Sequence, residues 1–453
     1  MLVNFSVANF LSFNKRTTFS MESGRATKKT EHIFEGADKS LLRFAAIYGK
    51  NGAGKSNFIK SLSFFRQFIV FGMTFEAAPG YWCKVEKENE GRPSEFEAEF
   101  IAGGKRMSYS LSVILSTGQI VRECLTLLNG GRKTKLFCKE EGQQEFAFHS
   151  SVMGKRREIE ILSRSFSVNE KPLLFHLNVF ARKFLQENEG AGIISLAFYW
   201  FAECLEIIFP DQPLSETSLL QKDKNEKFES LLHKFDTGIS KVKWEKISKE
   251  KMFSQLDTAT LTRLNSDMQS ISLLQNAARG QKADGNWTAM IRNRFNFFVA
   301  QQEKSGSFSF YTLKFVHRIN GQNVEFSMDA ESDGTHRLFQ LLEILMTQKP
   351  KVFVIDEISR CLHPKLTVQF VEKYLKYASE KGKEVQLITT THETRLMSHK
   401  ILRRDEVMLC DLEQDGSTVL YSLEDKQVRI DKVLEENYML GEWGGVPVFQ
   451  QEE

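Results

Sequence analysis

The chain has 453 residues, of which 41% are hydrophobic and 26% are charged, as is typical of a soluble globular protein with two or more lobes. Its 61 basic and 58 acidic residues leave a formal net charge of +3, which excludes any global charge argument for nucleic-acid binding. The longest apolar runs are too short to span a bilayer, and the first residues lack the pattern of a signal peptide. We therefore expect a cytoplasmic protein with no membrane partner.

Cysteine and phenylalanine usage points to ordinary structural roles. The six cysteines have no C-x-x-C spacing, so we expect reduced thiols and neither disulfides nor a zinc site. The 38 phenylalanines gather in short apolar clusters such as Phe64-Phe65 and Phe295–Phe298, and we expect them to form core and not base-stacking platforms.

The N-terminal part of the chain predicts strands followed by a phosphate-type loop. Residues Leu2–Phe13 alternate in polarity and predict an early strand and a turn. The apolar run Arg43–Ile47 then leads into a glycine-rich turn, and Asn57–Val70 has helical character. The order is therefore strand, loop, helix.

The turn between them, Gly49–Ser56, matches the complete motif G-x-x-x-x-G-K-[ST]. Glycines permit a close backbone approach, and the backbone N–H groups then point at phosphate oxygens, assisted by the start of the helix. Lys55 is expected to reach the outer phosphates and Ser56 to bind Mg²⁺. A glycine-rich turn without function is the disfavoured alternative. The predicted nucleotide-binding residues are Gly49, Lys50, Asn51, Gly52, Ala53, Gly54, Lys55, Ser56 and Asn57.

The middle of the chain changes pattern twice. Short alternating stretches between residues 96 and 148 predict antiparallel hairpins, and residues 163–294 are mostly helical in pattern. The charged stretch Gln221–Lys251 is interpreted as a solvated helical face. Strand character returns at Tyr311–Ile319.

These patterns predict an α/β protein with one nucleotide-binding head made from both ends of the chain. Residues 1–125 would supply the phosphate loop and an antiparallel β subdomain. Residues 126–304 would be an insertion, a β hairpin followed by mostly helical structure. Residues 305–453 would complete the head.

Two acids follow a second apolar strand. Val352–Ile355 is a continuous apolar run, which suits a parallel strand buried on both faces, and Asp356 and Glu357 come directly after it. Acids at that place are costly to bury unless they are paired or bind a ligand. Asp356 is predicted to hold Mg²⁺ through water, and Glu357 to polarise the attacking water as the catalytic carboxylate. Incidental acids at a strand end are the alternative, disfavoured beside a complete phosphate loop.

A third apolar strand, Val385–Thr391, ends in His392. It follows a predicted helix over Leu366–Ser379, so the segment fits one βαβ step. A lone histidine is usually structural, but this position makes His392 a second catalytic candidate, contacting the γ-phosphate or ordering the attacking water.

Together these motifs resemble the ATP-binding-cassette/SMC clan, and within it the RecF-like and OLD-like ATPases of AAA type. Asn9–Phe13 is similar to the clan's N-terminal strand, and Asp356–Pro364 to its Walker B and D-loop. Glu331–Arg337 is similar to its signature segment, with Glu-Ser-Asp-Gly-Thr in place of Leu-Ser-Gly-Gly-Gln, which leaves Ser332 and Gly334 to meet a γ-phosphate. No Q-loop glutamine is identified.

The resemblance implies an ABC-type head that uses ATP and Mg²⁺. It also implies a homo-oligomer built from two-fold head pairs, in which Ser332 and Gly334 of one subunit face the ATP of the other. The segments Arg403–Val407 and Tyr438–Gly444 resemble the tail of phage-defence ATPases such as those of the Septu and PARIS systems. The stretch after His392 is too short for the Toprim nuclease domain of OLD proteins.

The leading hypothesis is a defence-type sensor or scaffold ATPase that controls a separate effector chain, of nuclease type, in response to a nucleic acid or a phage protein. The alternative is a RecF/SMC-like DNA-repair ATPase that clamps DNA, with Lys155–Arg157 and Arg403-Arg404 as candidate basic contacts. The nucleotide-binding subunit of a membrane transporter is a third class, disfavoured by the Asn9–Phe13 start and the unusual signature.

Overall fold

The structure, a computed structural model, forms two compact units. It describes residues 1–26, 28–36, 38–72, 80–143, 145–155, 171–180, 189–210, 222–258, 260–262, 264–266, 268–269, 288–292, 297–303, 305–426 and 434–447. Unit 1 consists of Met1–Pro210, Gln348–Ser359 and Thr367–Glu453, and unit 2 of Asp211–Thr347 and Arg360–Leu366. This division differs from the expected boundaries at residues 125 and 304, because the chain returns to unit 1 sheets well after residue 125.

The centre of unit 1 is a six-stranded sheet with the order β11-β17-β18-β5-β19-β20. All neighbouring strands pair in parallel except β19 and β20, which are antiparallel. Every residue of β5, β17 and β18 is buried, as expected for parallel strands covered on both faces. This confirms the three predicted apolar strands. The bounds are β11 Leu205–Ile208, β17 Lys351–Ile355, β18 Val385–Thr390, β5 Phe44–Tyr48, β19 Val407–Leu412 and β20 Thr418–Ser422.

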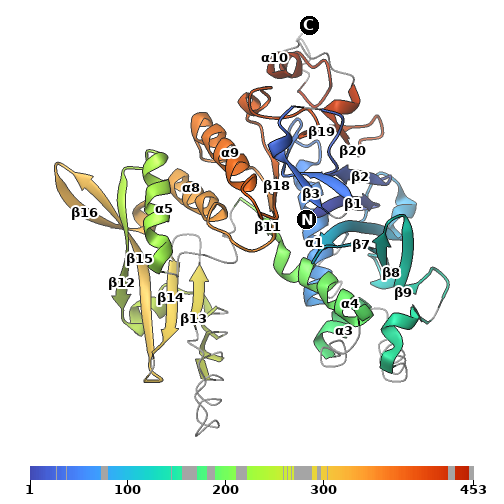
Figure 1. The fold of residues 1–453 in the computed structure, drawn as a ribbon, viewed down its shortest axis with the longest axis horizontal. Helices are drawn as coiled ribbons and strands as arrows, with labels where there is room; N and C mark the ends of the chain where they lie inside the picture. The colour runs from blue at the N-terminus through green and yellow to red at the C-terminus, as the bar shows by residue number, and fades with distance from the viewer. Residues whose placement is uncertain are drawn as a thin grey trace. The chain divides into compact units, whose positions relative to one another are not determined.

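Two helices follow strands of this sheet in the predicted order. Helix α1 (Lys55–Phe71) follows β5 and ends at Gly72, whose left-handed conformation suits a helix C-terminus. Helix α9 (Pro364–Ala378) connects β17 to β18 and lies beside β18 in Figure 1. The predicted bounds of both helices lie within two residues of the observed ends. The remaining unit 1 helices are α3 Leu173–Phe180, α4 Glu189–Tyr199 and α10 Leu434–Met439.

The second large sheet of unit 1 is antiparallel and has seven strands, in the order β10-β9-β8-β7-β6-β1-β2. It confirms the predicted hairpins. The core between this sheet and α1 is rich in phenylalanine: Phe5, Phe65 and Phe100 are all fully buried. The bounds are β1 Leu2–Ala8, β2 Thr17–Ser20, β6 Ser94–Ala102, β7 Lys105–Ile114, β8 Gln119–Asn129, β9 Arg132–Lys139 and β10 Ala147–Phe148, and a separate hairpin joins β3 Ile33–Gly36 to β4 Lys39–Leu42.

The structure corrects the expectation that all cysteines are reduced. Cys124 and Cys138 are direct cross-strand neighbours on β8 and β9 and form a disulfide. The sequence spacing did not reveal this pair, because the hairpin register alone brings the two side chains together. Cys83, Cys204, Cys361 and Cys410 are free.

A buried carboxylate joins the antiparallel sheet to α3. Glu123 on β8 accepts hydrogen bonds from the backbone N–H groups of Leu173 and Leu174 at 2.8 and 3.1 Å and from the Tyr109 hydroxyl at 2.8 Å. Burial raises the pKa of Glu123 to about 7, although these three donors and Lys139 act in the opposite direction. The folded protein therefore holds a proton here at pH values where the unfolded chain has lost it.

We expect unit 1 to become less stable as the pH rises from about 5 to about 8, because ionisation of Glu123 is easier in the unfolded chain. The contribution of Glu123 to the free energy of unfolding is complete below the pKa that it has in the unfolded chain. This contribution, on the order of a few kcal/mol, is lost as the pH rises through the pKa that Glu123 has in the folded protein. Thermal melting of the wild type and Glu123→Gln across this range measures it. The variant should have a flatter pH profile, and equal slopes would contradict the assignment.

Unit 2 contains a five-stranded antiparallel sheet, in which β12, β15, β14 and β13 are neighbours in that order and β16 pairs with β15. The expected mostly helical pattern over residues 163–294 thus includes more β structure in its described parts. In the charged stretch, α5 buries Phe228 and lies along β12 in Figure 1, so the stretch is not one solvated helix. The bounds are β12 Ile239–Ile247, β13 Thr288–Arg292, β14 Phe297–Gln302, β15 Phe308–Ile319, β16 Gln322–Ser327, α5 Lys222–Lys234, α6 Lys249–Phe253 and α8 Asp333–Ile344.

The predicted role of the aromatic clusters is confirmed where they are described. Phe64, Phe65, Phe297 and Phe298 are buried, while Phe295 lies outside the described residues. Among the helices that the structure describes, none combines the length and the apolar character needed to cross a bilayer.

Candidate functional site

The phosphate-type loop lies between the end of β5 and the start of α1, at the carboxyl edge of the parallel sheet. Close contacts leave no room for a side chain at two of its glycines. A Cβ atom at Gly49 would lie 2.3 Å from the Cys410 carbonyl oxygen, and one at Gly54 would lie 2.1 Å from Thr418 Oγ1, with φ at 108°. The loop then enters α1 at Lys55, so the first N–H groups of a 17-residue helix lie at its end. A helix start of this kind binds anions.

The side chain of Lys55 is buried. It crosses the loop, and Nζ donates to the carbonyl oxygens of Gly49 and Lys50 at 2.7 and 3.0 Å. Burial lowers the pKa of Lys55, and the negative charges of Asp356 and Glu357 are among the influences that oppose this shift. The lysine and the two acids are therefore within electrostatic reach of one another.

The loop is supported from outside by residues that sequence reasoning missed. Thr418 on β20 donates to the Ala53 carbonyl oxygen at 2.8 Å, and its hydroxyl lies 2.7 Å from Ser12 Oγ. Ser12 Oγ also accepts from the Asn57 side-chain amide at 2.9 Å. Ser12 belongs to the motif Asn9–Phe13, but neither the motif nor any pattern around Thr418 indicates these contacts, because they depend on segments from opposite ends of the chain meeting at the loop.

The C-terminal segment makes a further contact with the loop. Asp411 forms an ion pair with Lys50 at 3.7 Å, and its other oxygen accepts from the Gly445 N–H at 2.9 Å. Tyr438 packs its ring on Tyr48 and donates to the Gly445 carbonyl oxygen at 2.9 Å. The segment around Tyr438 and Gly445 thus holds the start of the phosphate loop.

The two predicted acids lie at the end of β17, beside the end of β18. Asp356 is buried, and its Oδ1 accepts from Thr390 Oγ1 at 2.5 Å. Glu357 is partly exposed, and its backbone N–H donates to the same Thr390 oxygen at 2.8 Å. Thr390 therefore holds the Asp356 carboxylate and the backbone of Glu357, a role that the sequence did not assign.

The backbone of Glu357 has a left-handed conformation, with φ at 52°. This conformation is uncommon for a residue other than glycine, and such residues gather at functional sites. Successive side chains of a strand point to opposite faces. The left-handed conformation of Glu357 ends this alternation after β17, so the Asp356 and Glu357 side chains need not point to opposite faces.

His392 follows β18 and is exposed. Partial burial of the ring lowers its pKa, Lys55 lowers it further, and Glu357 acts in the opposite direction. The structure thus brings His392 into the same electrostatic neighbourhood as the loop lysine and the predicted catalytic carboxylate. A neutral imidazole at this place accepts or donates a hydrogen bond without adding charge.

Ser332 and Gly334 lie in unit 2, at the start of α8. Ser332 caps the helix: its Oγ accepts from the Thr335 N–H at 3.1 Å. Gly334 is close to the backbone, since a Cβ there would lie 2.8 Å from the Cys361 carbonyl oxygen. Helix α8 therefore begins within the signature-like segment Glu331–Arg337, with Ser332 as its N-cap.

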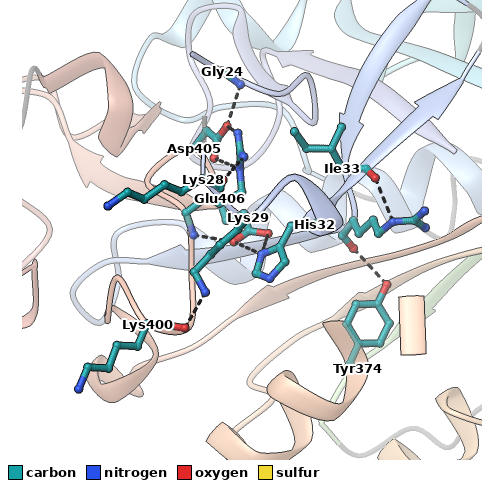
Figure 2. A network of polar contacts seen from close by, with 11 residues as sticks. Gly24, Lys28, Lys29, His32, Ile33, Tyr374, Lys400, Asp405 and Glu406 are labelled. Carbon is teal, nitrogen blue, oxygen red and sulfur yellow. Dashed lines mark hydrogen bonds and ion pairs between the residues drawn. The ribbon is translucent and has the colours of Figure 1, made fainter. Parts of the chain in front are cut away.

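Two acids just before β19 have structural roles in the fold. Asp405 and Glu406 are buried. Asp405 accepts two hydrogen bonds from the Arg403 guanidinium, at 2.9 and 2.6 Å, and Glu406 lies 2.9 Å from His32 Nδ1 (Figure 2). Arg403 is therefore neutralised and buried, which removes it from a surface track for DNA. The other proposed DNA contact, Lys155–Arg157, has no described side chains.

The family described as "AAA domain, putative AbiEii toxin, Type IV TA system" matches residues 44–398, more than three quarters of the chain, and the chain belongs to this family. The match begins at β5, before the phosphate loop, and ends after His392. No curated protein sequence matches the chain significantly. Among solved structures, the SMC head domain from Thermotoga maritima is similar over 93% of this chain and 98% of its own, with 13% identity and a TM-score of 0.36.

The residues at the loop and the strand ends fit ATP and Mg²⁺. The loop offers backbone N–H groups and one lysine for phosphates. Ser56 and Asp356 offer oxygen ligands of the kind that Mg²⁺ prefers. The open space around Gly52, where a Cβ would meet no atom within 4 Å, leaves the loop accessible.

Proposed function

We propose that the protein is an ATPase that binds ATP with Mg²⁺ at residues 49–57 and hydrolyses it with Glu357 as general base. Asp356 holds the metal through water, and Lys55 neutralises the outer phosphates. His392 orders the attacking water or contacts the γ-phosphate. The observation that carries the proposal is the meeting of three elements at one sheet edge. They are the phosphate loop, the Asp356–Glu357 pair, and Thr390, which binds the Asp356 carboxylate and the Glu357 backbone N–H.

The same proposal extends to the biological role. We infer that the nucleotide cycle works as a sensor or scaffold in a bacterial anti-phage defence system and controls a separate effector, of nuclease type. The family description, which names a putative toxin of a toxin–antitoxin system, supports a role in cell defence. The burial of Asp405 and Glu406 in ion pairs supports a separate effector, because these acids are engaged in the fold.

Replacement of Lys55 tests the nucleotide site. Lys55→Ala should reduce ATP affinity by at least about 100-fold, because the loop loses its one charge directed at the outer phosphates. Titration with a fluorescent ATP analogue measures the affinity, and melting curves check that the loop still folds without the contacts to Gly49 and Lys50. Lys60→Ala is the matched control, since Lys60 is an exposed lysine on the same helix.

In cells that carry the protein with its neighbouring gene, Lys55→Ala should also abolish protection in a phage plaque assay, while Lys60→Ala should retain it. Wild-type ATP affinity in Lys55→Ala would refute the site. Full ATP binding and hydrolysis by the wild type without any effect on plaque numbers would refute only the defence role. Nuclease activity of the purified chain alone would refute the separate effector.

A further inference from the structure

A second charged site lies away from the phosphate loop, in a pocket of about 400 Å³. Its basic lining comes from two stretches that are distant in sequence: the segment before β3, and the loop that leads from His392 into β19. Glu424, after β20, completes the lining. This volume lies in the range of small-molecule sites. None of the residues proposed to bind or hydrolyse ATP lines the pocket. The lining residues are Arg25, Ala26, Lys28, Lys29, His399, Leu402, Arg403, Arg404 and Glu424.

The charge of this pocket is strongly one-sided. Five arginine and lysine residues line it, against the single acid Glu424. Asp405, which binds the Arg403 guanidinium from behind, offsets one more positive charge. An excess of three positive charges remains at one small site, which is as large as the net charge of +3 of the whole chain. Such a concentration of positive charge creates a local electrostatic potential that attracts anions.

Polar contacts between the two basic stretches fix the walls of the pocket. Arg403 Nη1 donates to the Lys28 carbonyl oxygen at 2.7 Å, and Asp405 accepts from the Gly24 N–H at 2.8 Å. Lys29 Nζ donates to the Lys400 carbonyl oxygen at 2.6 Å, which joins the two stretches directly. Figure 2 shows these links, with the Lys28 and Lys400 side chains extending away from the buried pairs. The pocket is therefore a built feature of the fold.

Two of the lining cations, Arg25 and Lys28, are available for a ligand. Arg25 and Lys28 are exposed, and neither side chain forms an ion pair among the described residues. A guanidinium presents a planar fork of donors that matches phosphate oxygens, and an ammonium adds a compact charge. Several such groups around one pocket suit a multiply charged phosphate better than a single carboxylate.

We propose that this pocket is a second, non-catalytic site for a phosphate ester or anhydride, the shared chemistry of a free nucleotide-like ligand and of a nucleic-acid backbone. The proposal does not depend on ATP hydrolysis at the phosphate loop. The pocket nevertheless connects to that loop through one strand, because β19 begins directly after Glu406 and carries Cys410 and Asp411, which contact Ala53 and Lys50.

Direct binding measurements test the proposal. In the first experiment, inorganic pyrophosphate is titrated calorimetrically into the Lys55→Ala protein, which lacks the loop lysine. In the second, binding of a labelled single-stranded oligonucleotide is measured by fluorescence anisotropy at two salt concentrations. The test variant is Arg25→Glu/Lys28→Glu. The control is Arg132→Glu/Lys133→Glu, which makes the same charge change at exposed positions of β9 in the same unit. Melting curves establish that all variants fold.

The test variant should bind its phosphate ligand at least about tenfold more weakly than the control variant does, because each charge contact with phosphate supplies a large part of the binding free energy. Loss of pyrophosphate binding identifies a small phosphorylated ligand. Loss of oligonucleotide binding, with a smaller dependence on salt, identifies a nucleic-acid backbone. Equal affinities of test and control variants, or no binding of either probe to the parent protein, would overturn the proposal. Failure of ATP binding at the loop would leave these results unchanged.

Discussion

Glu357→Gln should retain ATP binding and lose at least about 100-fold in the rate of hydrolysis, because general-base catalysis typically contributes a factor of 10² to 10⁴. The amide has nearly the same shape as the carboxylate but cannot accept the proton of the attacking water. The backbone contact between the Glu357 N–H and Thr390 does not involve the replaced atoms, so the strand end should keep its conformation.

Single-turnover hydrolysis and ATP affinity are the two measurements for this variant. Glu372→Gln is the control, since Glu372 is an exposed acid on α9 outside the site. With hydrolysis blocked and ATP bound, size-exclusion chromatography should show a larger share of paired heads than in the wild type. If Glu357→Gln turns over ATP at the wild-type rate, then Glu357 is not the catalytic carboxylate, whatever the affinity.

The elements that place this site follow from local sequence. A continuous apolar run before Gly49, and others before Asp356 and His392, predict buried parallel strands, and β5, β17 and β18 are buried at every residue. Parallel strands end at a common edge, so the polar residues after them meet there. For this reason the loop and the acids could be predicted from one sequence.

The contacts that support the site could not be predicted in this way. Ser12, Thr390 and Thr418 are small hydroxyl residues without a distinctive pattern, and their roles depend on which strands become neighbours. The burial of Lys55 arises from the path of its side chain across the loop, which a motif does not describe. A motif gives the order of residues along the chain, whereas a support contact joins residues up to 406 positions apart.

The boundaries between the two units could not be predicted from the sequence pattern either. Charged residues on α5 and β12 concealed a helix with two buried apolar residues and a β-strand, so the stretch Gln221–Lys251 resembled a single polar helix. The short strand β11 gave no separate signal, although it pairs in parallel with β17 in the central sheet. In both cases long-range pairing decided the structure over local composition.

A mixture of two inactive variants should regain ATPase activity if the nucleotide is shared between two copies of this chain. The variants are Lys55→Ala, which removes the loop charge, and Ser332→Asp, which alters the start of α8. Ser332 is exposed and caps α8 by accepting from the Thr335 N–H. An aspartate caps a helix as well as a serine does, a role worth about 1 kcal/mol. Ser332→Asp therefore keeps the cap but places a carboxylate where we propose that a γ-phosphate approaches.

Ser332→Asn separates charge from structure, because asparagine also caps a helix and is neutral. We expect Ser332→Asn to retain much of the ATPase activity and Ser332→Asp to lose it. If Ser332 only caps its helix, all three proteins should have similar activity. Substitution of Gly334 is a weaker test, since any side chain there approaches the Cys361 carbonyl oxygen within the same unit.

In a mixed pair of heads, one composite site carries both changes and the other carries neither, because each site takes its loop from one copy and its Ser332 from the other. An equal mixture forms mixed pairs in half of its dimers, so roughly a quarter of the wild-type activity should return. Each variant alone should stay inactive. A contact within one chain predicts no recovery, since each copy then keeps its own defect. No recovery in mixed pairs verified by differential tags, or full ATPase activity in a strictly monomeric protein, would show that the two-fold arrangement is wrong.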